Sequence, residues 1–240
     1  MNDLKDEGYR PMDIKDLVKK RLEALASGDE EEIDKFVNQY LDSSTGIVTY
    51  GDEIKIIPNC EMLENIDRNP ELYHGGIKLT EESYNQLEGK TFNREDLILN
   101  EFLTEKEARE HPIWKELVGE ETLNDYVDAV FDFVKEEYGE DEAMGVYIHK
   151  GEDVPVLRSC GVYRFGDGYD GSFLGGNGNL RDYGTRLVGV KDAEGVAENF
   201  EGVLSKYSIN SPEELDEIIS AYKKEENTIS KRVKNFFSRK

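Results

Sequence analysis

Residues 122–165 read TLNDYVDAVFDFVKEEYGEDEAMGVYIHKGEDVPVLRSCGVYRF, and this stretch decides the fold class. Its first half carries apolar side chains at the three- and four-residue spacing of a helix. They are Leu123, Tyr126, Val127, Val130, Phe131, Val134 and Tyr138. Gly139 is placed to end that helix, and from Ala143 the pattern changes to the β-branched and aromatic runs typical of strands. A long helix followed directly by strands predicts an α+β protein.

The strands after Ala143 are predicted at residues 144–149, 154–165, 172–174 and 186–190. The turns between them are rich in glycine, which adopts positive φ at little cost. We therefore expect an antiparallel meander of three or four strands, with the 123–138 helix packed on it.

The N-terminal region predicts a pair of helices and a small hairpin. One helix is marked by the apolar residues Ile14, Leu17, Val18, Leu22 and Leu25, and a second by Ile33, Phe36, Val37, Tyr40 and Leu41. Gly28 separates them, and residues 43–46 break the second pattern. The β-branched runs 47–50 and 54–57, with Gly51 in the turn between them, predict the hairpin.

The remaining segments are helical in pattern, and residues 79–139 look helical throughout. Residues 79–139 contain a capping box at Thr104 and Glu107 and a helix break at His111, which precedes Pro112. Helices are also expected at 193–207 and 212–224. The mixed segment 59–78 is the best candidate for a boundary, which predicts a domain of residues 1–78, the helical pair plus hairpin, and a helix–sheet–helix domain of residues 79–240. A single domain is the alternative.

Composition indicates a folded, strongly acidic protein. The 240 residues are 37% hydrophobic and 10% aromatic, and the formal net charge is −23. This charge opposes binding to nucleic-acid phosphates and anionic membranes unless a local basic patch overrides it. No run approaches the apolar length of a membrane span, and the N-terminus has no signal-peptide pattern. Cys60 and Cys160 form no CxxC pair, so we expect a soluble protein of the reducing cytoplasm.

The glycine-rich loops contain two patterns that suggest ligands. Residues 166–171 match GxGxxG, but no helix follows to receive a pyrophosphate, and Asp167 and Asp170 would repel it. Oxygen side chains in the same loops could suit calcium: Asp167, Asp170, Asn177, Asn179 and Asp182. The run 175–180 is a single copy, whereas calcium-binding repeats stack in several. Turn formation explains both patterns better, so no cofactor and no metal are predicted.

The residues with catalytic chemistry are scattered. His74, His111 and His149 are too far apart in sequence to form a local metal motif. Cys160 lies within a predicted strand, which is typical of a small buried side chain. A spatial pair of Cys160 with His149 or His111 would make a nucleophile instead. The sequence therefore leaves the catalytic residues unknown.

Two basic groups are the candidate binding residues. Arg158 and Arg186, with Arg164 and Arg181, fall in the glycine-rich strand region and could hold an anion or carboxylate, although surface ion pairs are the simpler interpretation. The second group lies in residues 227–240, which contain five basic residues and no acidic one. Its candidates are Lys231, Arg232, Lys234, Phe236 and Phe237. This segment either docks on the body of the protein or binds another protein, a nucleic acid or a membrane surface.

Several stretches between residues 98 and 190 are shared with other sequences. They are residues 103–104 and 111–114 (HPIW), 126–139, 143–148 (AMGVYI), Pro155 with Leu157 and Arg158, and 186–190. In these stretches the chain resembles a group of uncharacterised archaeal proteins of unknown function. The resemblance implies an archaeal intracellular source and a helix-then-sheet unit, and it implies no activity or ligand.

Two functional hypotheses follow from the sequence. The first is a non-enzymatic binding or interaction protein, because no catalytic motif holds in its context. The alternative is a small hydrolase-type enzyme with a site in the glycine-rich β region near Arg158, Cys160 and Arg186, because loops on a rigid scaffold commonly carry function.

Overall fold

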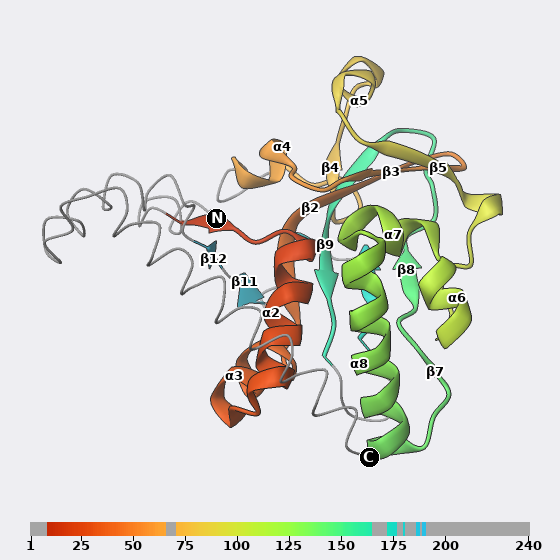
Figure 1. The fold of residues 1–240 in the computed structure, drawn as a ribbon. Coiled ribbons are helices and arrows are strands. Elements are labelled where there is room, and N and C mark those ends of the chain that lie inside the picture. Colours follow the sequence, from red (N-terminus) through yellow and green to blue (C-terminus); the bar gives the residue numbers. More distant parts are fainter. Residues whose placement is uncertain are drawn as a thin grey trace, which may run out of the picture. The chain divides into compact units, whose positions relative to one another are not determined.

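The computed structural model describes residues 9–65, 71–164, 172–176, 180, 186–187 and 189–190 (Figure 1). By its internal contacts the chain divides into residues 1–190 and 191–240, and every described residue belongs to the first unit. No helix among the described residues is long and apolar enough to cross a membrane. The helices predicted at 193–207 and 212–224 lie outside the described residues.

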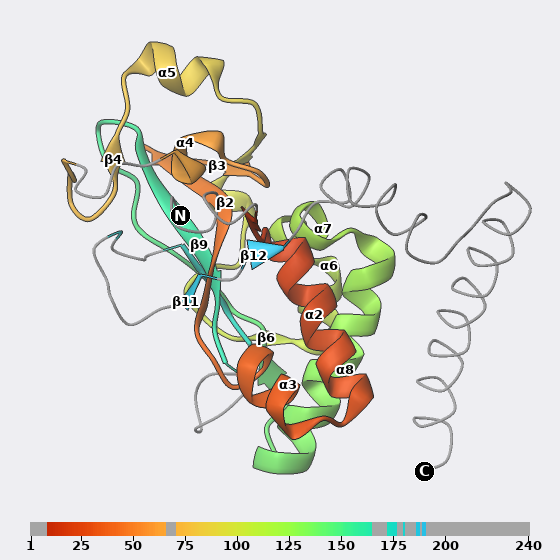
Figure 2. The ribbon, with the colours of Figure 1, turned by 90° about the vertical axis from the view of Figure 1, so that its left-hand side faces the viewer.

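One side of the described unit is a layer of helices (Figures 1 and 2). They are α2 (Ile14–Ser27), α3 (Glu30–Phe36), α6 (Glu105–Glu110), α7 (Pro112–Val118) and α8 (Glu120–Tyr138). Their predicted ends are confirmed where the chemistry was specific. Gly28 and Gly139 end α2 and α8 in the left-handed conformation, and Thr104 and Glu107 form the capping box of α6. Pro112 begins α7, where its missing N–H costs nothing.

The other layer is a mixed eight-stranded sheet with the order β5-β3-β2-β9-β10-β8, to which β4 adds beside β9 and β11 beside β2. The bounds are β2 (Leu41–Tyr50), β3 (Glu53–Ile57), β4 (Ile77–Lys78), β5 (Lys90–Asn93), β8 (Val146–Ile148), β9 (Val156–Val162), β10 (Leu174–Gly176) and β11 (Arg186–Leu187). Two short pairs lie apart from it: β1 (Arg10–Pro11) with β12 (Gly189–Val190), and β6 (Leu103–Thr104) with β7 (Glu142–Ala143). Helices α4 (Glu61–Glu64) and α5 (Glu81–Gln86) and the 3-10 turn η1 (Arg94–Asp96) complete the described elements.

The α+β class is confirmed, but the strand arrangement differs from the predicted meander. The consecutive strands β8 and β9 are not neighbours, because β10 lies between them, antiparallel to β9 and parallel to β8. The connection 149–155 explains this. It is not a tight turn, since the backbone N–H of Gly51 donates to the Glu152 carbonyl and that of Leu79 donates to the Pro155 carbonyl. The connection thus runs over other segments and leaves the edge of β9 open to β10. Strands from both sides of residue 78 share this one sheet.

Residues 43–46 were predicted to separate a helix from a strand, and this was wrong. Helix α3 ends at Phe36, and β2 begins at Leu41 and continues through a register shift between Asp42 and Gly46. Three buried hydroxyl residues make this bulge possible by bonding the backbone that it leaves unpaired. Ser43 Oγ donates to the Cys160 carbonyl at 2.6 Å, and Thr45 Oγ1 donates to the Pro58 carbonyl at 2.9 Å. The backbone N–H of Ser44 donates to the Met12 carbonyl.

Apolar residues gather on both faces of the sheet. The larger cluster joins α2, α7 and α8 to the inner face, where Val146, Ile148, Cys160, Val162 and Leu174 lie. The smaller cluster covers part of the outer face, where Leu63 of α4 and Tyr84 of α5 meet Val48 and Leu157. Both faces of the sheet are therefore covered by apolar side chains over only part of its length.

Helix α8 carries the predicted apolar stripe. Its members are buried from Leu123 to Val134, but Tyr138, in the last turn, is 42% exposed. The helix packs on α2, α6 and α7. Beside it, the fully buried Trp114 of α7 donates its indole N–H to the Met144 carbonyl at 2.8 Å. Trp114 thus ties the helical layer to the segment that leads into β8.

Arg21 is a charged residue at the centre of the larger cluster. Its side chain is fully buried. The guanidinium donates to four carbonyl oxygens, those of Phe36, Gln39, Val162 and Tyr163, and to the hydroxyls of Tyr126 and Ser172. These acceptors belong to the end of α3, the loop after it, α8, the end of β9 and the approach to β10. One side chain therefore joins the helical layer to the sheet, which the helical spacing of α2 could not indicate.

His111 occupies the break between α6 and α7, as the sequence predicted. It is almost fully buried, and Nε2 lies 2.9 Å from the Ile98 carbonyl oxygen. Because a carbonyl only accepts, Nε2 carries the proton, and the buried Nδ1 has no partner among the described residues. Burial lowers the pKa of His111, and the bond to Ile98 opposes this shift.

We expect His111 to make the protein less stable in mild acid. Its folded pKa lies below that of the unfolded chain, near 6.5, so the unfolded state takes up the proton first. The stability contributed by neutral His111 is present above that pH and is lost as the pH falls through the folded pKa. The drop in unfolding free energy between pH 7.5 and pH 5, measured in urea, should be smaller in His111→Gln. A drop in His111→Gln equal to that of the wild-type protein would contradict this account.

Candidate functional site

Arg158, a predicted binding residue, lies near the start of β9, next to the part of that strand that pairs with β4. Its side chain is only 1% exposed. The turn at residues 73–76 covers it: a Cβ added at Gly76 would stand 3.0 Å from Arg158 Cγ and 2.7 Å from the Leu157 carbonyl. His74 takes a positive φ of 48° in this turn, which is uncommon for a residue with a side chain.

The side chains around Arg158 form a cluster centred on Glu152. Arg158 Nη2 donates to the Glu152 carboxylate at 3.3 Å and to the His74 carbonyl at 3.0 Å. The other carboxylate oxygen of Glu152 lies 2.8 Å from His74 Nδ1, and His149 Nδ1 lies 4.0 Å from the carboxylate. We call these four residues the Glu152 cluster. His74 is 63% exposed and Glu152 is 13% exposed, so the cluster opens to solvent at its histidine side.

Burial dominates the electrostatics of this cluster. It lowers the pKa of the Arg158 guanidinium, and the hydrogen bond to Glu152 opposes this. Arg158 Nη1 is buried without a hydrogen-bond partner among the described residues. The carboxylate thus neutralises a buried cation and also orients the His74 ring.

Cys160 does not belong to this cluster. Its side chain is fully buried in the larger apolar cluster. Burial raises the pKa of its thiol well above the ordinary value, and the charge of Asp42 adds to the shift. A thiol that stays protonated is a poor nucleophile. Both cysteines are reduced and buried.

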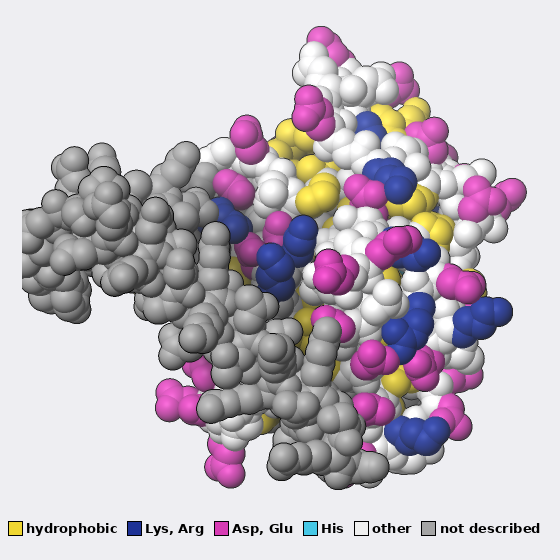
Figure 3. Space-filling view, in the orientation of Figure 1, with side chains coloured by type: hydrophobic (Ala, Val, Ile, Leu, Met, Phe, Trp, Pro, Cys, Tyr) yellow, Lys and Arg dark blue, Asp and Glu magenta, His cyan; other side chains and the backbone are white. Residues whose placement is uncertain are grey.

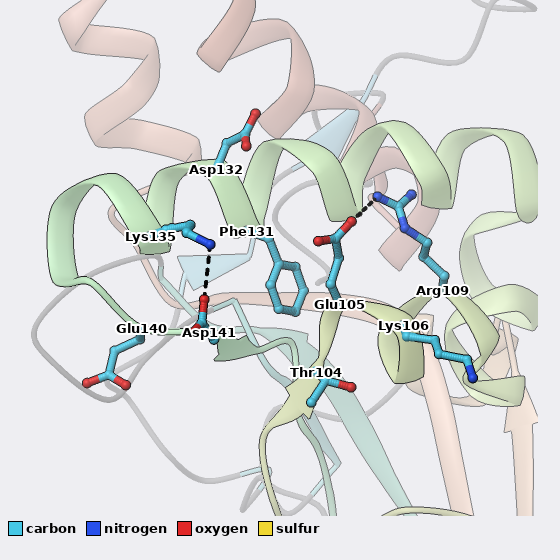
Figure 4. Close-up of a pocket in the computed structure, with 9 residues that line it drawn as sticks. All are labelled: Thr104, Glu105, Lys106, Arg109, Phe131, Asp132, Lys135, Glu140 and Asp141. Carbon is cyan, nitrogen blue, oxygen red and sulfur yellow. Dashed lines mark hydrogen bonds and ion pairs between the residues drawn. The ribbon is translucent and has the colours of Figure 1, made fainter.

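A pocket of about 610 Å³ lies between α6 and α8 (Figure 4). Phe131 points into it from α8, and charged side chains form its rim. These charges pair with one another: Arg109 with Glu105 at 2.6 Å, and Lys135 with Asp141 at 3.2 Å. The pocket is therefore bordered by surface ion pairs, which contribute little energy each.

Five aromatic rings lie together beside β8, the end of β9 and the start of β10. We call Tyr40, Phe102, Tyr147, Tyr163 and Phe173 the aromatic face. Tyr163 and Phe173 stack with centroids 4.1 Å apart, Tyr147 meets Phe173 edge-on at 4.8 Å, and Tyr40 meets Tyr163 edge-on at 4.8 Å. Phe102 lies 6.0 Å from Tyr147. All five side chains are partly exposed.

Strand alternation explains why these rings point away from the helical layer. Tyr147 lies between the buried Val146 and Ile148, and Phe173 and Tyr163 adjoin the buried Leu174 and Val162. Successive side chains of a strand point to opposite faces, so Tyr147, Tyr163 and Phe173 occupy the outer face. Glycine makes room for them: a Cβ at Gly175 would stand 2.2 Å from Tyr163 Cε2.

The helical surface differs from the aromatic face. Figure 3 shows Lys and Arg side chains interspersed among Asp and Glu on the side where the helices lie. Mixed charge of this kind is typical of a solvated surface.

The other predicted site residues are placed less fully. The backbone of Arg186 lies in β11 and pairs with Leu41 of β2 in a parallel register. Lys231, Arg232, Lys234, Phe236 and Phe237 lie outside the described residues, as do all five loop residues considered for calcium. Among the residues that the structure does describe, no group of His, Cys, Asp and Glu is arranged to hold a metal ion.

Sequence reasoning missed both the aromatic face and the Glu152 cluster. The alternation of Tyr147 with buried neighbours was a readable signal, but the five rings come from five separate segments. His74 and Glu152 are far apart in sequence and meet only because β4 pairs with β9. No local pattern could have joined them.

No protein-family model and no curated protein matches this sequence significantly. A solved structure described as "Accommodation of massive sequence variation in Nanoarchaeota by the C-type lectin fold" has a TM-score of 0.50 and 15% sequence identity to this chain. The comparison covers 78% of this chain and 87% of that one. At this identity the likeness concerns the fold alone: the chain is folded similarly to a protein with a C-type lectin fold.

Proposed function

We propose that this chain is a non-enzymatic binding or interaction protein that receives its partner on the aromatic face. The observation that carries the proposal is the gathering of five partly exposed rings on an outer sheet surface. Large exposed aromatic patches mark interaction sites more often than plain surface, and Tyr and Phe are enriched at protein interfaces.

The rings also have the rigidity that binding requires. Tyr147 and Phe173 adjoin strands whose other face is buried in the core, so little conformational freedom remains to be lost when a partner binds. The similar solved structure is described as a fold that accommodates massive sequence variation. A scaffold that tolerates variation at its surface suits a binding module, which supports the proposal for this chain by analogy of fold.

A random peptide library displayed on phage tests the proposal with the complete 240-residue chain. Clones selected on the wild-type protein should lose binding to Tyr147→Ala, because that substitution removes one ring of the aromatic face and its contacts with Phe102 and Phe173. They should still bind Tyr138→Ala, which removes an exposed tyrosine from α8 instead. If selection yields no clone that depends on Tyr147, the aromatic face is not an interaction surface and the proposal fails.

The second candidate function is a small hydrolase, and the Glu152 cluster favours it. A histidine oriented by a carboxylate is the geometry of a general base, and His74 is exposed while Arg158 fixes Glu152. Cys160 cannot serve as its nucleophile in this environment. Turnover separates the two functions: hydrolysis of an activated ester that is lost in His74→Gln would favour the enzyme.

Three further parts of the proposal rest on sequence. They are a cytoplasmic location, a relationship to the uncharacterised archaeal proteins, and a binding role for the basic segment 227–240. The location rests on Cys60 and Cys160, which form no CxxC pair, and the segment's role rests on its concentration of basic residues.

A further inference from the structure

We infer that the partner received by the aromatic face is cationic, namely a segment of a basic protein that presents arginine or lysine side chains. This inference rests on the proposed function and specifies its ligand. It is argued from the acids beside the rings, from a cation already held on one of them, and from the charge of the whole chain.

Acidic residues adjoin one end and the middle of the aromatic face. At one end, the site of a Cβ on Gly145 lies 2.5 Å from the Glu101 carbonyl and 2.7 Å from the Tyr147 ring, so Glu101 and Tyr147 are neighbours. The negative charge of Glu101 contributes to raising the pKa of Tyr147, after the larger effect of burial. In the middle, Asp42 Oδ1 would stand 3.1 Å from a Cβ on Gly161, and Gly161 pairs with Gly175, over which the Tyr163 ring lies.

The rings themselves attract cations. The face of an aromatic ring carries negative charge, and a guanidinium or ammonium within about 6 Å of its centre is stabilised. Arg164 already lies over the Tyr40 ring, 5.2 Å from its centroid. The opposite end, at Phe102 and Tyr147, has the exposed Glu101 beside it. A partner side chain with a positive charge therefore meets both a ring and a carboxylate there.

The net charge of the chain argues against a second copy of the chain, a nucleic acid or an anionic membrane as the partner of the aromatic face. Two copies of a chain that carries −23 repel each other, as do this chain and a nucleic acid or an anionic membrane. A basic partner is attracted over several ångströms before contact, which raises its association rate. Charge complementarity thus selects a cationic partner.

Titration calorimetry with three synthetic peptides in 150 mM salt tests the inference. The peptides have nine residues and alternate glycine with arginine, glutamate or serine. We expect the full-length chain to bind the arginine peptide and neither of the others. Tyr147→Ala and Glu101→Gln should each weaken that binding at least about threefold, as the loss of one cation–π contact or one charge partner predicts. Tyr147→Leu keeps the apolar bulk without the ring charge and should weaken binding as well, which decides the matter if the alanine variant folds poorly.

Matched controls separate this inference from general attraction to an acidic protein. Tyr138→Ala removes an exposed ring from α8, and Glu82→Gln removes an exposed charge from α5. Both should leave the affinity for the arginine peptide unchanged. Equal weakening by all the variants, or none by any, would overturn the inference. If phage selection yields Tyr147-dependent clones without cationic residues, the interaction function stands and the cationic partner is wrong.

Discussion

Replacing Arg21 by methionine is expected to lower the free energy of unfolding by about 4 kcal/mol or more. Methionine fills much of the same volume, so the loss comes from hydrogen bonds and not from a large cavity. Six acceptors lose their donor, and four of them are backbone carbonyls. A buried acceptor left without a partner costs about 1–3 kcal/mol, and even two such groups would reach the expected value. Urea denaturation followed by far-ultraviolet circular dichroism measures the change.

Lys20→Met is the matched control for Arg21. Lys20 precedes it in α2, is 40% exposed and forms an ion pair with Glu23 one turn away. Such a pair contributes a few tenths of a kcal/mol, so the control should change stability by less than about 0.5 kcal/mol. A loss below about 1 kcal/mol in Arg21→Met would show that water or a rearranged backbone replaces the guanidinium. The joining role assigned to Arg21 would then be wrong.

Trp114→Ala is expected to destabilise the protein by about 3–5 kcal/mol, the usual cost of removing a large aromatic side chain from a core. Trp114 is fully buried in α7 and packs near Tyr126, with ring centroids 6.1 Å apart. Its removal also leaves the Met144 carbonyl without the indole donor. Thermal and urea unfolding by circular dichroism report the loss, because the only tryptophan fluorophore is removed with the substitution.

Trp114→Phe divides this loss into its two parts. Phenylalanine retains most of the apolar surface but cannot donate to Met144, so its cost should be clearly smaller than that of alanine. Tyr138→Ala, at the exposed end of α8, should cost less than about 1 kcal/mol. If Trp114→Ala were no worse than Tyr138→Ala, the core position of α7 would be contradicted.

Local signals predicted the helix ends well and the sheet less well. Residues 79–139 were predicted to be helical throughout, which was wrong, because strands β5 and β6 interrupt them. Gly28, Thr104 with Glu107, Pro112 and Gly139 fixed helix ends because capping depends on neighbouring residues alone. Strand order depends on partners that are distant in sequence. The insertion of β10 between β8 and β9 therefore could not be read from residues 144–176. The bulge at residues 43–46 was mistaken for a break because serine and threonine are also the residues of loops.

The candidate site was predictable only in part. Arg158 was identified because arginine is conspicuous in an acidic chain, and it does lie in a polar cluster. Its partners His74 and Glu152 come from other segments, and no periodic pattern connects them. The aromatic face needed the same three-dimensional information, because only Tyr147 lies within a strand and the other four rings come from separate parts of the chain.

The pairing of β2 with β9 has a consequence for how the chain is made. Their partners, such as Thr49 and Val156, are more than a hundred residues apart, so the centre of the sheet closes one of the longest loops in the described unit. Pairings of this kind slow folding, because the entropy of closing the loop is lost before the contacts form. A ribosome adds about 5–20 residues per second, so β2 and β3 wait for several seconds before β9 exists. During that interval Ile47 and Val48 have no cover from β9, and the nascent hairpin is the segment on which a chaperone would act.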